Sequence, residues 1–151
     1  MRASPAAIAL FETLRPTMLA RAAALRPRLE TDSDVADDRA AAHRRQIEAV
    51  LNHTNNLLIS GDIRSHRDFL HTFMAVRASE AVSPTGVITM LTEIGDTAGR
   101  VVGQNGDTAS HRELIMALTL TTALTVKICN DLIARDLEHK TAQRNGMRAG
   151  R

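Results

Sequence analysis

The sequence predicts an all-α fold of about five helices, and three observations lead to this prediction. Aromatic residues are almost absent, since the 151 residues include no Trp, no Tyr and three Phe. Strands are usually rich in aromatic and β-branched side chains, so this composition favours helices. Apolar residues recur at helical spacing along most of the chain, and no segment alternates as a strand does. With 44% hydrophobic residues, a chain of this length can form one core and one domain.

The first helix is predicted over residues 5–26. Ser4 followed by Pro5 is a favourable N-cap and first helical residue. Pro16 lacks an N–H and clashes with the preceding turn, so it should bend or break this helix.

An acidic stretch, ETDSDVADD, separates the first helix from the second. It partly matches the spacing of a calcium loop, but Ala36 and Asp37 stand where a ligand and a glycine are needed. We interpret it as a solvated loop in which Asp37 or Asp38 caps a second helix over about 38–60.

The third and fourth helices are predicted over 65–82 and from Ser83-Pro84 to about residue 104. Three glycines of the fourth helix fall on one face at intervals of four, and no phosphate-binding glycine motif is present. A glycine face suits the close approach of a neighbouring helix, with a frayed or kinked helix as the alternative.

The last helix is predicted over about 110–140, with residues 141–151 as a disordered tail or linker. It is apolar on nearly every side until Lys127, so it must be covered all round, as the central helix, in a dimer interface, or both. The residues that we assign to helix packing or to a dimer interface are Gly95, Gly99, Gly103, Leu114, Leu118, Thr121, Leu124, Thr125, Ile128 and Leu132.

The sequence contains one repeated stretch, GDIRSHRDFL and GDTASHRELI. In each copy a serine stands three residues before an acid, which is the arrangement of a capping box. We expect Ser65 with Asp68, and Ser110 with Glu113, to cap two helices. The alternative, an acid and histidine pair in each copy, offers only two ligands where a structural zinc needs four.

The sequence contains no catalytic motif and no zinc or di-iron motif, so we expect no enzymatic activity, metal or cofactor. If haem binds, His53 and His66 are the candidate ligands, because they lie close to apolar stripes. The scattered arginines and missing aromatic residues argue against nucleic-acid binding. The longest charge-free run, 114–126, is too short for a membrane span. A single Cys129 fits the reducing cytoplasm.

The segment LLISGDIRSHRDFLHTFMAVRASEAVSPTGVITMLTEIGDTAGRVV resembles the N-terminal, non-haem globin-like domains of RsbR-type stressosome proteins. The shared features are an apolar triplet, a polar turn, a helix ending in Val76-Arg77-Ala78, a Ser-started helix and a long final helix. The resemblance covers about residues 8–140. It implies a globin-like, dimeric sensor or scaffold domain over 1–140 that relays stress signals to STAS-domain or kinase partners without catalysis.

A second resemblance, to the four-helix cap of cobalamin-binding regulators, is carried by Gly61-Asp62, Ser83-Pro84 and the position of Ser110-His111. It implies a helical domain that binds a tetrapyrrole, haem or cobalamin. The chain lacks the Trp that such caps place over the cofactor.

Overall fold

The structure, a computed structural model, describes residues 2–25 and 33–149. These residues form five α-helices and no strand, which confirms the predicted all-α fold. In chain order the helices are α1 (Pro5–Ala24), α2 (Ser33–Ser60), α3 (Ile63–Ser79), α4 (Pro84–Gln104) and α5 (Ala109–Ala149).

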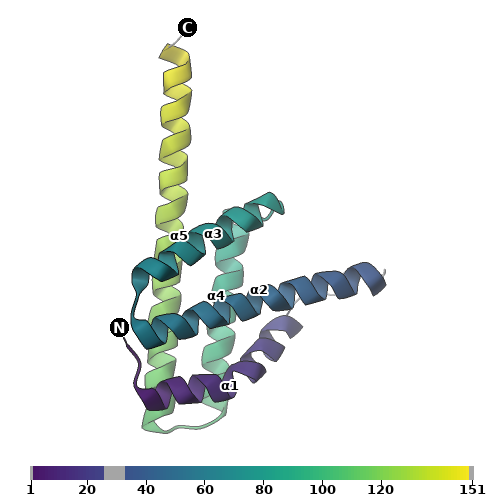
Figure 1. Cartoon of the computed structure of the whole chain (residues 1–151), viewed down its shortest axis with the longest axis vertical. Helices are drawn as coiled ribbons and strands as arrows, with labels where there is room; N and C mark the ends of the chain where they lie inside the picture. The colour runs from purple at the N-terminus through teal and green to yellow at the C-terminus, as the bar shows by residue number, and fades with distance from the viewer. Residues whose placement is uncertain (1, 26–32, 150–151) are drawn as a thin grey trace.

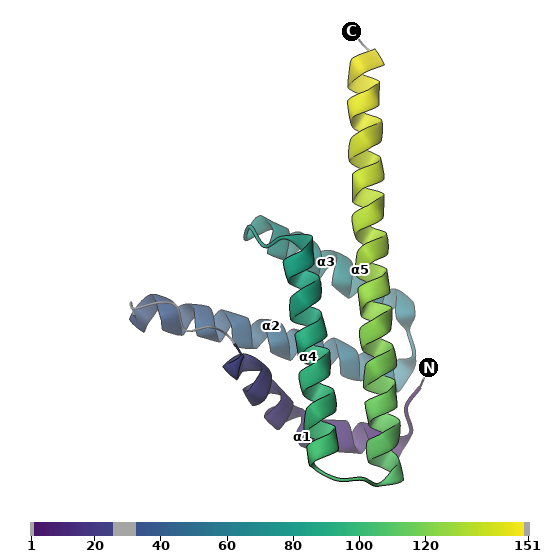
Figure 2. The ribbon, with the colours of Figure 1, turned by 180° about the vertical axis from the view of Figure 1, so that it is seen from behind.

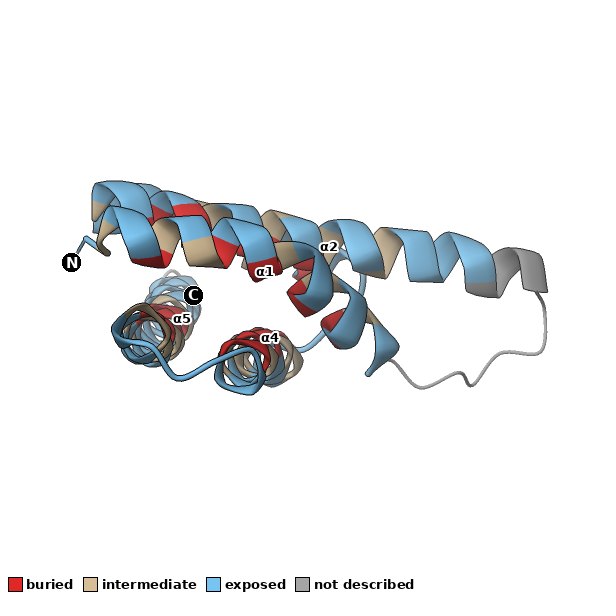
Figure 3. Ribbon diagram, turned by 90° about the horizontal axis from the view of Figure 1, so that it is seen from below, coloured by how far each residue is buried: buried red, intermediate tan, exposed pale blue. Residues whose placement is uncertain are grey.

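The helices form two layers (Figure 1). α4 and α5 lie side by side and antiparallel, and they share the most extensive contact in the fold. α1, α2 and α3 cross one face of this pair, as the view from behind also shows (Figure 2). In Figure 3, which looks along α4 and α5, buried residues of α1 face the pair. The core therefore lies between the two layers.

Each helix contributes an apolar stripe to this core, because side chains three and four residues apart share one face of a helix. The largest fully buried side chains come from all five helices: Phe11, Met18, Ile47, Leu51, Leu57, Leu58, Leu70, Val87, Val101, Val102, Leu114 and Ile128.

The predicted starts of α1 and α4 are confirmed. The Ala7 N–H donates to Ser4 Oγ at 3.2 Å, and the Gly86 N–H donates to Ser83 Oγ at 3.1 Å. A proline follows each cap and supplies a backbone φ that suits the first turn. Pro16 lies inside α1, which remains one helix but bends part-way along its length (Figure 1).

The predicted start of α2 is wrong. The helix begins at Ser33, so Asp37 and Asp38 lie within its early turns and do not cap it. Both residues are exposed. Carboxylates are favourable near the positive end of a helix, and the alanines that follow propagate it, so the helix extends toward its N-terminus. Residues 26–32, which include the start of the acidic stretch, lie outside the described residues.

The two predicted capping boxes are also wrong, because an earlier residue than the predicted serine accepts the backbone N–H at each helix start. Asp62 is the N-cap of α3, and its Oδ1 accepts the Ser65 N–H at 3.1 Å. At α5, Thr108 Oγ1 accepts the His111 N–H at 3.3 Å. Gly61, with φ 68°, turns the chain directly before Asp62. The repeated stretch is therefore capped at different positions in its two copies.

Glu113 joins the start of α5 to the start of α1. Its Oε1 accepts the Ser4 N–H at 2.8 Å, and its Oε2 accepts the Ser4 hydroxyl at 2.6 Å. These two hydrogen bonds hold the pKa of Glu113 below its usual value, since they favour the carboxylate. The acid assigned to a local cap instead ties together two chain segments more than 100 residues apart.

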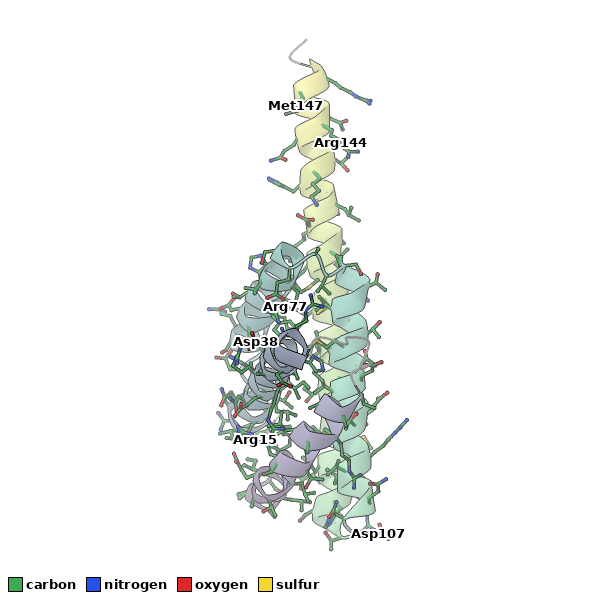
Figure 4. The ribbon with its side chains drawn as sticks, turned by 90° about the vertical axis from the view of Figure 1, so that its right-hand side faces the viewer. Arg15, Asp38, Arg77, Asp107, Arg144 and Met147 are labelled. Carbon is green, nitrogen blue, oxygen red and sulfur yellow. The ribbon has the colours of Figure 1, made fainter. Side chains whose placement is uncertain are left out.

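The described part of the predicted tail is helical. α5 continues to Ala149, and residues 134–148 are all exposed. Figure 4 shows this part of α5 extending beyond the body, with Arg144 and Met147 pointing into solvent. The expected disordered tail or linker from residue 141 is thus helical as far as residue 149, and a helical linker stays a prediction. Most side chains of this segment are charged or polar, with Leu137 and Met147 as exposed apolar residues.

One of the three aligned glycines makes the expected close approach. A Cβ atom on Gly95 would overlap Thr122 Oγ1 and lie 3.1 Å from Thr122 Cγ2. A Cβ on Gly99 would meet nothing within 4 Å, and one on Gly103 would lie 3.8 Å from Ile115 Cδ1. Gly95 is thus the position that lets α4 approach α5 closely.

This difference predicts opposite effects of two alanine substitutions. Gly99→Ala should raise the free energy of unfolding by about 1 kcal/mol, because Ala is the better helix former and space is free. Gly95→Ala should lower it by up to about 2 kcal/mol, because displacing Thr122 costs roughly 1–3 kcal/mol and the better helix propensity of Ala offsets about 1 kcal/mol of this. Denaturant unfolding measures both values. A stabilising Gly95→Ala would contradict the close contact between α4 and α5.

Candidate functional site

A small cavity of about 30 Å³ lies among α2, α3, α4 and α5. Most of its wall is apolar, with Leu51 and Leu118 among the contributing side chains. Three buried polar side chains also line it: His66 from α3, and Thr121 and Thr125 from α5. A polar cluster inside an apolar core is the most unusual chemical feature of the described residues, and it is our candidate site.

His66 is the centre of this cluster. It is 4% exposed, and its Nε2 lies 2.9 Å from Thr125 Oγ1. Burial, with a smaller contribution from nearby His53, lowers the pKa of His66 to about 4. The ring is therefore neutral at physiological pH, with one nitrogen that donates and one that accepts a hydrogen bond.

Thr121 differs from most threonines of the fold. Seven other threonines in the described helices donate their hydroxyl to the backbone carbonyl four residues earlier: Thr13, Thr54, Thr89, Thr92, Thr119, Thr122 and Thr141. The Thr121 hydroxyl is buried and has no hydrogen-bond partner within the protein, and the same holds for His66 Nδ1. An unpaired buried polar group costs about 1–3 kcal/mol.

A row of rings along α3 borders the cluster. His53 of α2 stacks on Phe69 with ring centroids 3.8 Å apart, and Phe69 lies 5.5 Å from Phe73. Phe69 also lines the cavity. Phe69 therefore forms part of the cavity wall, and the partly exposed His53 covers this ring from α2.

Arg77 lies next to the last ring of this row, that of Phe73. Its guanidinium lies 5.1 Å from the centroid of the Phe73 ring, and its Nε lies 3.3 Å from Glu80 Oε2. The residue is 9% exposed and lies within the body of the molecule (Figure 4). Its Nη1 is buried without a partner in the protein. The cation is held by one ring and one half-exposed carboxylate.

The two histidines named as candidate haem ligands lie beside the same cavity, but neither points into a space of tetrapyrrole size. Pockets for cofactors of that class measure several hundred Å³, about ten times the volume here. A tetrapyrrole would enter this cavity only if the surrounding helices moved apart. A second pocket, of about 210 Å³, lies elsewhere, among the end of α1, α2 and α4. No three His, Cys, Asp or Glu residues in the described ranges are close enough together to hold a metal ion.

Cys129 is buried in α5, and burial raises its pKa to about 11. The thiol is therefore protonated at neutral pH and a poor nucleophile.

The chain matches no protein-family model, no curated protein and no solved structure. Its candidate site is therefore interpreted from its own residues and their geometry.

Sequence reasoning identified His66, Thr121 and Thr125 separately, from their places on apolar stripes. It missed the contact between His66 and Thr125, which are 59 residues apart. The available signal was a histidine that shares a stripe with Leu70 and Phe73 and therefore had to be buried.

The low pKa of His66 predicts a dependence of stability on pH. Between pH 6.5 and about 4 the unfolded chain binds more protons than the folded one, so the free energy of unfolding should fall as pH is lowered through this range. The loss should reach up to about 3 kcal/mol. Denaturant unfolding at several pH values measures it.

His66→Gln should flatten this dependence, because Gln does not titrate. A smaller slope remains, since burial also lowers the pKa of His53. The exposed substitution Thr72→Gln on α3 removes no titratable group, so it is the control and should leave the slope unchanged. An equally steep slope in His66→Gln would show that other groups cause the effect.

The cavity volume predicts the outcome of a haemin titration. Wild type and His66→Ala should give the same visible absorption spectrum with haemin, because haemin does not fit into the cavity and its iron cannot bind the buried His66 ring. A shifted Soret band in wild type that His53→Ala or His66→Ala removes would restore the tetrapyrrole hypothesis.

Proposed function

We propose that this chain is a non-catalytic, dimeric sensor or scaffold domain that relays a signal through protein contacts, as the resemblance to RsbR-type stressosome proteins implies. The observation that carries the proposal is the unaccompanied end of α5. Residues 134–148 are helical yet all exposed, so this end of α5 lacks the tertiary packing that stabilises most helices in proteins. A partner that packs on this segment would stabilise it.

An exposed apolar stripe supports a second copy of the chain as this partner. Met116 is 62% exposed and Leu120 is 48% exposed, one turn apart on α5. Ala123 ends this stripe on the body, because the exposed polar residues Lys127, Asn130 and Asp131 separate it from Ala134 and Leu137 of the projecting segment. The stripe on the body is the helix-to-helix dimer contact that we propose.

The α5 residues that the sequence assigned to helix packing or to a dimer interface all contact the core of one copy. Leu114, Leu118, Thr121, Thr125 and Ile128 are buried within the chain, and Leu124 and Leu132 are partly buried against the core. They serve packing inside one copy, so a charge at Leu118 would unfold the domain. The opposite side of α5 is the one available to a partner.

Among the described residues, α5 is also the one helix long and apolar enough to cross a membrane by length and composition. About a third of its most apolar window is buried within the fold. That burial lies on one side, against the other helices. We propose a cytoplasmic domain with protein partners, STAS-domain or kinase proteins among them, because the resemblance to RsbR-type proteins implies it.

The dimer proposal predicts the effect of charges on the exposed stripe. Met116→Lys combined with Leu120→Lys should give a folded monomer at micromolar concentration, because lysines facing one another repel and are costly to bury. Light scattering measures the mass, and circular dichroism checks the fold. The exposed substitution Thr72→Lys on α3 is the control and should remain dimeric. A monomeric wild type, or a dimeric double variant, would contradict the proposal.

A further inference from the structure

The inside of the α3–α5 contact contains two polar atoms whose hydrogen bonds are not completed by the protein. His66 Nδ1 and Thr121 Oγ1 are both buried, and both residues line the cavity of about 30 Å³. They come from different helices. Whatever completes their hydrogen bonds must therefore fit in this cavity and can join α3 to α5.

The volume sets the size of the occupant. A water molecule needs roughly 10–15 Å³ of such space, so one or two fit and a drug-sized molecule does not. The wall sets its charge: no acidic, Lys or Arg side chain lines the cavity, and His66 is neutral at pH 7. An ion would be desolvated there without a counter-charge, which is unfavourable.

The hydrogen-bond roles set the chemistry. If His66 Nε2 donates to Thr125 Oγ1, then Nδ1 needs a donor; if the Thr125 hydroxyl donates to Nε2, then Nδ1 carries the proton and needs an acceptor. Thr121 can donate or accept, because its hydroxyl is not bonded to the preceding turn. A neutral molecule that both donates and accepts satisfies either arrangement.

We propose that this cavity binds one or two ordered water molecules that connect His66 of α3 with Thr121 of α5. The bound water completes the polar cluster and fixes the spacing of the two helices. The site depends only on the interior of one copy, so it stands whether or not the chain dimerises.

The decisive experiment is water ¹⁷O relaxation dispersion, which detects water held inside a protein, on wild type and three variants. Thr121→Val keeps the shape and removes the hydroxyl, so it should lose at least one long-lived water. Thr121→Ser keeps the hydroxyl and should retain it. Thr122→Val is the matched control, because the neighbouring Thr122 hydroxyl already donates to the Leu118 carbonyl at 2.9 Å.

Thermal unfolding of the same variants is an independent test, because the direction of the Tm change differs between a hydrated and a dry cavity. With water bound, Thr121→Val should lower Tm or leave it unchanged. In a dry cavity the substitution would remove an unpaired hydroxyl and raise Tm. A raised Tm, or an unchanged number of long-lived waters in Thr121→Val, would overturn the proposal.

If Thr121→Val does not fold, a high-resolution crystal structure of wild type decides. A density peak within hydrogen-bond distance of both atoms supports the proposal, and its absence from a well-ordered cavity overturns it. Mass measurements test the dimer separately, so the two proposals can fail independently.

Discussion

The antiparallel pair of α4 and α5 is the contact on which the rest of the structure depends. The other three helices cross one face of this pair, so the spacing of α4 and α5 sets the width of the face that they cover. Gly95 permits that spacing, since a methyl group at this position would occupy the space of the Thr122 side chain. Glu113, at the start of α5, then fixes the first residues of α1 across the same platform. The Gly95–Thr122 contact thus positions α5 against α4, and the hydrogen bonds between Glu113 and Ser4 join the start of α5 to the start of α1.

The helices themselves were predictable because burial imposes a period of three to four residues on apolar side chains. Each of the five helices contributes buried side chains at this spacing to the core. Their starts were less predictable. Asp62 competes with Ser65, and Thr108 with Ser110, and spacing alone does not rank such acceptors. The deciding factor is where the preceding turn ends, which depends on backbone angles such as that of Gly61. The end of α5 was missed because a disordered tail and a solvent-exposed helix share the same polar composition.

The candidate site was predictable residue by residue but not as an arrangement. His66 and Thr125 lie on apolar stripes, so their burial follows from periodicity. Their hydrogen bond depends on how α3 crosses α5, which no local pattern encodes. The same limit applies to the size of the cavity. Its volume follows from the packing of four helices, and it is too small to hold a tetrapyrrole.

The two sides of α5 place a polar interior contact and an exposed apolar stripe on one rigid element. Thr121 and Thr125 face the core, whereas Met116 and Leu120 face outward on the same turns. A helix transmits a shift along its axis because its backbone hydrogen bonds resist local deformation. A change in the spacing of α3 and α5 would therefore reach the outer stripe and the projecting segment without any change in secondary structure. The interior polar contact and the exposed stripe are thus mechanically connected through one helix.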